Sequence, residues 1–204
     1  GVKLVPRPAA TLILLRDGAS APEALMLQRT QSAVFLGGAY VFPGGSLDEA
    51  LADPRILKRI VGEIESPPAP YWVAAIRECF EEAGVLLLLQ KNKRLLDAKR
   101  AEGLAHYRKR AFVELLESED LYLPPNALAY YGHWLTAPGR PRRFDTRFFL
   151  AVAPEGQAGS HDAAETVHDV WITPREALER SARNEIVAPR RAASSTTWAT
   201  SPTA

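Results

Sequence analysis

The sequence predicts an α/β domain, because strand-like runs stand toward both ends of the chain and helical patterns lie between them. Apolar residues recur at helical spacing over 71–84, and 95–120 is mostly helical in character. Runs rich in aliphatic, β-branched and aromatic residues, which are typical of strands, occur at 10–18, 23–30, 39–47, 128–136, 146–153 and 166–173. At 204 residues, one domain is expected over 1–188, followed by a flexible tail at 189–204.

The first half of the chain changes character after residue 47. The first two strand-like runs are separated by a turn region of Gly, Ser and Pro, and the third ends in "PGG", whose glycines permit unusual backbone conformations. The next stretch is weakly helical and closes with "SPPAP", which is expected to be extended because prolines disfavour helix. We interpret residues from about 48 to 70 as an insertion.

The second half begins with the helix 71–84, which ends at Gly84, a residue suited to a helix C-cap. The run "VLLLL" at 85–89 is predicted to be a buried strand. Within 95–120, Gly103 is the weak point of the helical pattern. A last helix is expected to begin where the N-cap, first-turn proline and capping-box acid match Thr173, Pro174 and Glu176.

Composition excludes several classes of protein. The chain has 25 basic and 24 acidic residues, so its net charge does not favour binding to nucleic acid or to an anionic membrane. The apolar runs are far shorter than the roughly 20 residues that span a bilayer, so we expect a cytoplasmic protein. The only cysteine, Cys79, excludes an internal disulfide and is expected to lie in the core. The four histidines have no metal-ligand spacing.

The helix 71–84 carries two opposed faces. At 100° per residue, one face gathers Glu78, Glu81 and Glu82, and the other gathers Val73, Ile76, Cys79, Phe80 and Ala83. The acidic face has two interpretations. In the first, the face is a solvated surface, since a like-charge pair on a helix costs only about 0.2–0.5 kcal/mol. In the second, the face provides oxygen ligands for a hard divalent cation such as Mg²⁺.

The stretch "RECFEEAGV" at 77–85, together with the upstream "VFPGG", resembles the signature of the Nudix hydrolases, G-x5-E-x7-R-E-U-x-E-E-x-G-U, where U is aliphatic. The second half of the signature matches position by position. In the first half, the residue six positions after Gly45 is Leu51 instead of Glu, and Arg77 lies 32 residues after Gly45. The insertion accounts for the excess length, and it makes the chain similar to the long-insert branch related to coenzyme A diphosphatases.

The resemblance implies a Nudix fold, in which a mixed sheet is sandwiched between helices (α/β/α) and the signature forms a loop-helix-loop. It also implies a pyrophosphohydrolase that depends on Mg²⁺ or Mn²⁺ and cleaves a nucleoside diphosphate linked to a group X. Coenzyme A or its esters, ADP-ribose and dinucleotides are candidates for that small-molecule partner. The Arg, His and Gly known ahead of "FPGG" in the better-defined coenzyme A branch are not evident. A homodimer is compatible with the resemblance, since many relatives pair.

Site residues follow from the matched positions. The resemblance implies metal ligation by Glu78, Glu81 and Glu82, all within the catalytic set, and by the Gly45 carbonyl. Arg77 would orient a glutamate of the signature, which is support for a ligand. For the general base, we expect Glu165, with Asp162 as the alternative and a signature glutamate also open. Asp48 or Glu49 could reach the place of the missing first glutamate.

Arginines outside the signature are candidates for phosphate contacts, because the guanidinium fork suits phosphate oxygens. The first candidates are Arg29 and Arg147, and the second group is Arg140, Arg142 and Arg143. The aromatic residues Phe35, Tyr40 and Trp134 either stack on a base or belong to the core.

Two competing functions remain open. The absent first glutamate is compatible with a silent Nudix domain that binds a nucleotide as a sensor. A structural module with a charged helix face would require the match to the signature to be accidental.

Overall fold

The computed structural model describes residues 5–32, 38–140, 142–160 and 166–183. The strands are β1 (Arg7–Arg16), β2 (Glu23–Arg29), β3 (Tyr40–Val41), β4 (Gly44–Ser46), β5 (Leu128–Leu135), β6 (Phe144–Val152) and β7 (Thr166–Ile172). The α-helices are α1 (Pro54–Leu57), α2 (Ala69–Ala83), α3 (Ala98–Gly103), α4 (Phe112–Ser118) and α5 (Pro174–Ala182). Short 3-10 turns are η1 (Glu49–Ala52), η2 (Ala105–Lys109) and η3 (Pro125–Ala127).

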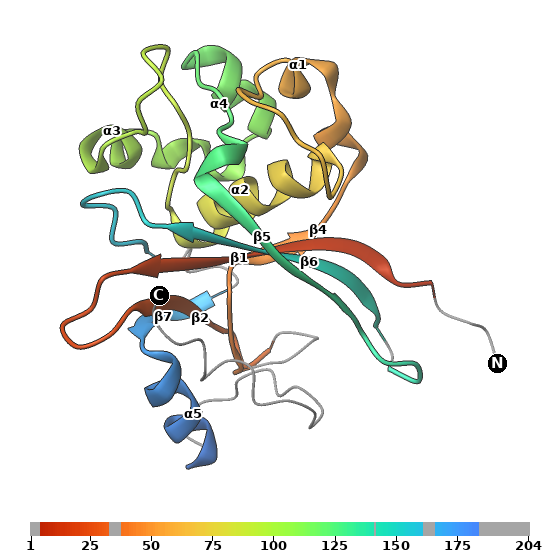
Figure 1. Ribbon diagram of the computed structural model, residues 1–204, viewed down its shortest axis with the longest axis vertical. Coiled ribbons are helices and arrows are strands. Elements are labelled where there is room, and N and C mark those ends of the chain that lie inside the picture. Colours follow the sequence, from red (N-terminus) through yellow and green to blue (C-terminus); the bar gives the residue numbers. More distant parts are fainter. Residues whose placement is uncertain (1–4, 33–37, 141, 161–165, 184–204) are drawn as a thin grey trace.

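The strands form one mixed sheet in the order β3-β2-β1-β6-β5, with β4 paired to β1 and β7 to β2. β1 runs parallel to β6, and the other pairings are antiparallel. Helices α1 to α4 lie on one side of the sheet and α5 lies on the other (Figure 1). The predicted mixed sheet between helices is therefore confirmed. No helix of the described residues is long and apolar enough to span a membrane.

Helix α2 holds its apolar face against the sheet. Its predicted core residues are all at most 1% exposed, and the Trp72 ring lies 4.7 Å from the Phe149 ring of β6. Burying a side chain as large as Phe80 stabilises the fold by about 1.5–3 kcal/mol. The helix ends at Gly84, whose φ of 68° is left-handed and whose amide donates to the Phe80 carbonyl. The predicted cap is confirmed, and it fixes the register of the acidic face.

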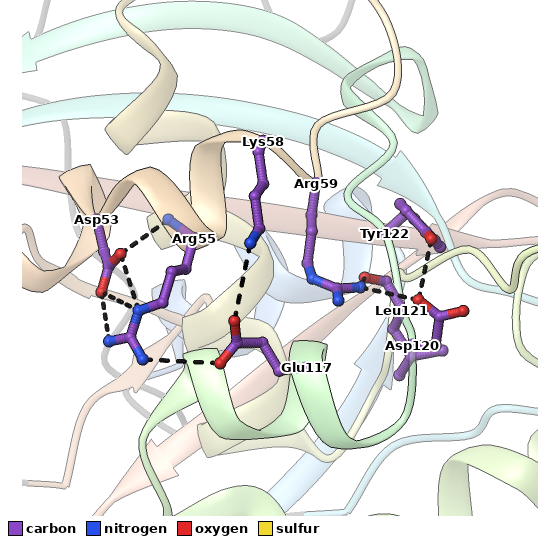
Figure 2. Close-up of polar contacts among 8 residues, drawn as sticks. All are labelled: Asp53, Arg55, Lys58, Arg59, Glu117, Asp120, Leu121 and Tyr122. Carbon is purple, nitrogen blue, oxygen red and sulfur yellow. Dashed lines mark hydrogen bonds and ion pairs between the residues drawn. The ribbon is translucent and has the colours of Figure 1, made fainter.

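The inserted stretch packs on α2 and on the segment after α4. Ile56 is buried in the main core, and Ile60 bridges to Leu123. Figure 2 shows the polar contacts of this region: Arg59 donates to Asp120 at 3.2 Å and to the Leu121 carbonyl at 3.1 Å. The neighbouring pairs are Arg55 with Asp53 and Glu117, Lys58 with Glu117, and Tyr122 with Asp120.

The proline-rich end of the insertion differs slightly from the prediction. Helix α2 begins at Ala69 and contains Pro70 in its first turn, where a missing backbone N–H costs nothing. The extended part therefore stops at Pro68. The carbonyl of Pro67 accepts a hydrogen bond from the Trp72 indole at 2.8 Å, which ties this end of the insertion to α2.

The strand predicted at 85–89 is wrong. Residues 85–88 are fully buried but lie outside any strand, and only isolated bridges join Leu89 to Leu95 and Tyr122. The reason is the buried Gln157 side chain, which bonds both the amide and the carbonyl of Leu86 and the carbonyl of Leu96. A side-chain amide thus satisfies backbone groups that a neighbouring strand would otherwise pair.

The other helical predictions agree with the structure. The segment 95–120 forms α3, η2 and α4, with the first break directly after Gly103. Helix α5 begins as expected, because the Thr173 hydroxyl accepts from the Glu176 amide at 3.2 Å. The expected tail at 189–204 lies outside the described residues.

Candidate active site

Helix α2 and strand β4 bring two carboxylates against a pair of glycines. Glu82 accepts a hydrogen bond from the Gly44 amide at 2.9 Å. A Cβ at Gly45 would lie 2.6 Å from the Glu78 carboxyl carbon, so a glycine there leaves the space that the carboxylate occupies. At Gly44 a Cβ would meet the Ala10 carbonyl at 2.6 Å. The paired glycines of "PGG" are therefore required by close approach of side chain and backbone.

Burial separates the two interpretations of the acidic face. Glu78 and Glu82 are each 9% exposed, so these two carboxylates do not lie on a solvated surface. Glu81 is more exposed, and its carboxylate lies 3.8 Å from Nε of Arg77. Because a buried carboxylate is costly without a partner, the two inner glutamates need defined electrostatic contacts.

Arg77 supplies one such contact. Its Nη2 donates to Glu78 and to the Ser46 carbonyl, and its Nη1 donates to Asp48. Burial alone would lower the pKa of the Arg77 guanidinium, but the charge of Glu78 and the hydrogen bonds outweigh burial and raise that pKa above its ordinary value. Arg77 is therefore charged at every physiological pH, and it faces three carboxylates with one positive charge.

Asp48 and Glu49 differ in what they reach. Asp48 lies two residues after the end of β4 and contacts Arg77. Glu49 starts η1 and is exposed. Of the two acids that could stand in for the missing glutamate, it is Asp48 that contacts the arginine of the signature.

Arg108 is a residue that sequence reasoning missed. From η2 it donates to the carbonyls of Glu81 at 3.0 Å and Glu82 at 2.9 Å, and to that of Ser160 at 3.2 Å. A cation at these carbonyls is favourable, because the C-terminal end of a helix carries partial negative charge. No motif marks Arg108, since its role depends on a contact with a helix 26 residues earlier.

The residues present fit a divalent cation as a partial ligand set. The candidate donors are the two buried carboxylates of α2 and, by the family pattern, the backbone carbonyl of Gly45, where the absence of a Cβ leaves room for the Glu78 carboxylate. Among the described residues, no three Asp, Glu, His or Cys side chains are arranged to hold a metal ion together, so Glu78, Glu81 and Glu82 do not form such a group. An incomplete set of hard oxygen donors suits Mg²⁺, which usually keeps waters and substrate phosphates in its shell.

Arg29 is the last residue of β2. Its backbone pairs with Thr166 of β7, and its buried Nε has no hydrogen-bond partner among the described residues. The predicted base Glu165 and its alternative Asp162 belong to 161–165, outside the described residues, as does Phe35.

Arg147 occupies a different position. It lies in register with Ala10, which pairs on its other side with Gly45, so Arg147 stands two strands from the glycine pair. Its guanidinium pairs with Asp145 and lies 5.3 Å from the ring centre of Tyr71. Of the second arginine group, Arg140 and Arg142 are exposed, and Arg143 donates to the Thr136 carbonyl.

The remaining candidates divide between core and surface. Tyr40 is buried with Met26 and Ile172, so it belongs to the core, while Trp134 is largely exposed. Cys79 is fully buried, and burial together with the charge of Glu82 raises the pKa of its thiol well above the ordinary value. A thiol that stays protonated is a core residue and not a nucleophile.

The fold and the glycine-carboxylate geometry together define a Nudix domain. A family model described as the NUDT19 Nudix domain matches residues 67–192, and the chain belongs to this family. The resemblance deduced from the signature is therefore confirmed.

Two curated relatives and one solved structure are similar to this chain. The acyl-coenzyme A diphosphatase NUDT19 of Homo sapiens is 32% identical over 81% of the chain and 57% of the relative, and that of Xenopus laevis is 28% identical over 77% and 54%. The chain thus spans about half the length of these relatives. The crystal structure of a NUDIX hydrolase from Alicyclobacillus acidocaldarius is 32% identical, with a TM-score of 0.81, over 91% of this chain and 87% of that one.

Proposed function

We propose that this domain is a divalent-metal-dependent pyrophosphohydrolase whose substrate is coenzyme A or an acyl-coenzyme A. The observation that carries the reaction type is the pair of buried carboxylates, Glu78 and Glu82, against Gly44 and Gly45. The substrate class rests on the relatives, which are named acyl-coenzyme A diphosphatases. ADP-ribose and dinucleotides stay as competing substrates. Cytoplasmic location and a homodimer stay predictions.

The reaction adds water across a P–O–P linkage. One P–O bond forms to the water oxygen, one breaks to the bridging oxygen, and the proton of water must be accepted by a base. Mg²⁺ or Mn²⁺, when bound, neutralises phosphate charge and polarises the P–O bonds. In this proposal Glu78, Glu82 and the Gly45 carbonyl would hold the ion, with Glu81 as a further candidate ligand.

The chain's other residues would bind and orient. Arg77 holds the Glu78 carboxylate in place, and Arg108 holds the end of the helix that carries Glu82. Arg29 would donate to a phosphate, which is supported by its buried, unpartnered Nε in the described part of the chain. Arg147, already paired with Asp145, would contact a more distant part of the substrate.

Glu165 would accept the proton of the attacking water. In sequence it directly precedes Thr166, the first residue of β7, and a carboxylate is a suitable general base. Asp162 is the alternative.

The test is a substrate panel with a matched variant. The protein is incubated with coenzyme A, acetyl-coenzyme A, ADP-ribose, NADH, diadenosine polyphosphates and nucleotide sugars, each with Mg²⁺ or Mn²⁺, and products are separated by chromatography. We expect metal-dependent cleavage of the coenzyme A compounds, lost in Glu82→Gln. Preferential cleavage of another compound would overturn the substrate class, and no cleavage by folded protein would overturn the reaction.

A ligand-binding domain without turnover is the second candidate. It is favoured by one observation, since the position of the first signature glutamate is occupied by Leu51, a core residue. Calorimetry with the same panel separates the two functions. Binding of a nucleotide with no product, unchanged by Glu82→Gln apart from its metal dependence, would favour a sensor.

A further inference from the structure

The signature lacks its first acid in this chain, and an acid at a different position contacts its arginine. Leu51, which stands where the signature has glutamate, is 1% exposed and lies in the main core. Residue 51 therefore provides no carboxylate near α2. Three residues earlier, Asp48 accepts a hydrogen bond from Nη1 of Arg77 at 2.5 Å.

We infer that Asp48 is a positioning residue, which acts through Arg77 to fix the metal-holding carboxylate of Glu78. The inference rests on the function proposed above. Asp48 occupies one edge of the planar guanidinium, and Glu78 and the Ser46 carbonyl occupy Nη2. Because the guanidinium is planar and rigid, a hydrogen bond at Nη1 fixes the orientation of Nη2. The ammonium group of Lys has no such planar geometry.

Without Asp48, Arg77 has a choice of carboxylates. Glu81 lies 3.8 Å from its Nε, so a small rotation of the guanidinium would trade the Glu78 contact for a closer Glu81 contact. The Asp48 contact opposes this rotation. Its expected effect is thus on the orientation of Glu78 more than on the stability of the fold.

The backbone on both sides of Asp48 is fixed. Upstream, Ser46 pairs with Ala9 in the sheet, and the Leu47 amide donates to the Pro8 carbonyl at 2.9 Å. Downstream, the Leu51 amide donates to the Asp48 carbonyl at 3.2 Å, and the Leu51 side chain is buried. The insertion therefore carries an anchored carboxylate into the site.

Exposure makes the inference testable. The Asp48 side chain is 52% exposed, whereas that of Arg77 is 11% exposed. Replacing Asp48 by Asn removes charge at the surface and keeps the shape of the side chain. Glu63→Gln is the matched control, because it removes the charge of another exposed acid in the same insertion.

The experiment measures Mn²⁺ binding by electron paramagnetic resonance, with thermal unfolding in parallel. We expect Asp48→Asn to weaken Mn²⁺ affinity about 10-fold, as supporting residues of metal sites do, with an unchanged Tm. Asp48→Glu should restore part of the affinity, and Glu63→Gln should bind as the wild type. In an Arg77→Gln background Asp48→Asn should have no further effect, since both act through one contact.

Each alternative outcome is decisive. Wild-type affinity in Asp48→Asn, or a loss in Glu49→Gln instead, would overturn this inference and leave the proposed function intact. Equal additional loss in the Arg77→Gln background would show that Asp48 does not act through Arg77. Failure of the wild type itself to bind Mn²⁺ would overturn the inference together with the proposed function.

Discussion

The two halves of the Nudix signature in this chain are built differently. The helix half, 77–85, follows one regular element, so fixed spacing places Glu78 and Glu82 one turn apart on the same face. The loop half begins at Gly45 in β4 and enters an insertion made of short elements, η1 and α1, so no single regular element joins Gly45 to residue 51. In the loop half, the carboxylate that contacts Arg77 is that of Asp48, whereas the signature places its glutamate at residue 51. Spacing is thus reliable within a helix and unreliable across a loop that has been lengthened.

The largest expected effect lies in the helix half. Glu82→Gln keeps the shape of the side chain and its capacity to accept from the Gly44 amide, but it removes a charged ligand. We expect kcat/KM to fall by about 100-fold or more, because ion and phosphate lose charge compensation. Steady-state kinetics with the substrate found by the panel measures this fall.

The Tm of Glu82→Gln distinguishes the loss of a metal ligand from unfolding of the variant. Removing a buried charge relieves its desolvation cost, so the Tm of Glu82→Gln should equal or exceed that of the wild type. A variant that retains full activity would remove Glu82 from the proposed metal site.

The next effect tests the glycine where the two halves touch. Gly45→Ala places a Cβ 2.6 Å from the Glu78 carboxyl carbon, so strand or carboxylate must move. We expect a loss of about 1–3 kcal/mol in the free energy of unfolding, as in other overpacked sites. Chemical denaturation measures it.

Gly103 is the control for Gly45, because it makes no close contact with a side chain. At Gly103, at the end of α3, a Cβ would meet nothing within 4 Å. Gly103→Ala should be neutral or stabilise the protein by up to about 1 kcal/mol, because Ala has the higher helix propensity. If both variants lose stability equally, close approach is not the reason for Gly45.

These contrasts show what sequence reasoning can reach. The apolar face of α2 and the cap at Gly84 follow from short-range patterns and are as predicted. Each strand-like run outside 85–89 overlaps a strand, but 39–47 divides into β3 and β4, and the glycines expected to end one strand lie inside β4. The geometry of Glu78, Glu82 and Gly45 also agrees with the signature, while their roles stay predictions. The strand at 85–89 failed because Gln157, about 70 residues away, satisfies that backbone. Long-range partners of this kind leave no local pattern.

The same argument explains the residues that were missed or left open. Arg108 donates to backbone carbonyls of α2, and a contact with a backbone carbonyl is not revealed by a pairing of residue types. The choice between Asp48 and Glu49 depends on the path of the insertion, which composition does not determine. Glu165 stays a prediction.

A smaller effect concerns the end of the helix half. Arg108→Met keeps most of the apolar stem and removes the guanidinium from the carbonyls of Glu81 and Glu82. We expect the free energy of unfolding to fall by about 1 kcal/mol, the scale of charge interactions at helix ends. Urea denaturation measures it, and Arg110→Met, in the same loop, should have less effect. Equal losses in both variants would contradict a cap on α2.

The smallest effect concerns the anchoring of the insertion to the rest of the fold. Hydrogen bonds from Tyr122 and Arg59 lower the pKa of Asp120 below its ordinary value. A lowered folded pKa contributes stability above the unfolded value of about 3.9, and this contribution is lost as the pH falls through the folded pKa. Asp120→Asn should therefore lower the Tm slightly at pH 7, and the difference from the wild type should shrink below pH 4. Scanning calorimetry across this range, with the exposed Asp17→Asn as control, measures it. A difference that is constant with pH would mean that the charge of Asp120 does not anchor the insertion, and that buried contacts such as those of Leu51 and Ile56 hold it alone.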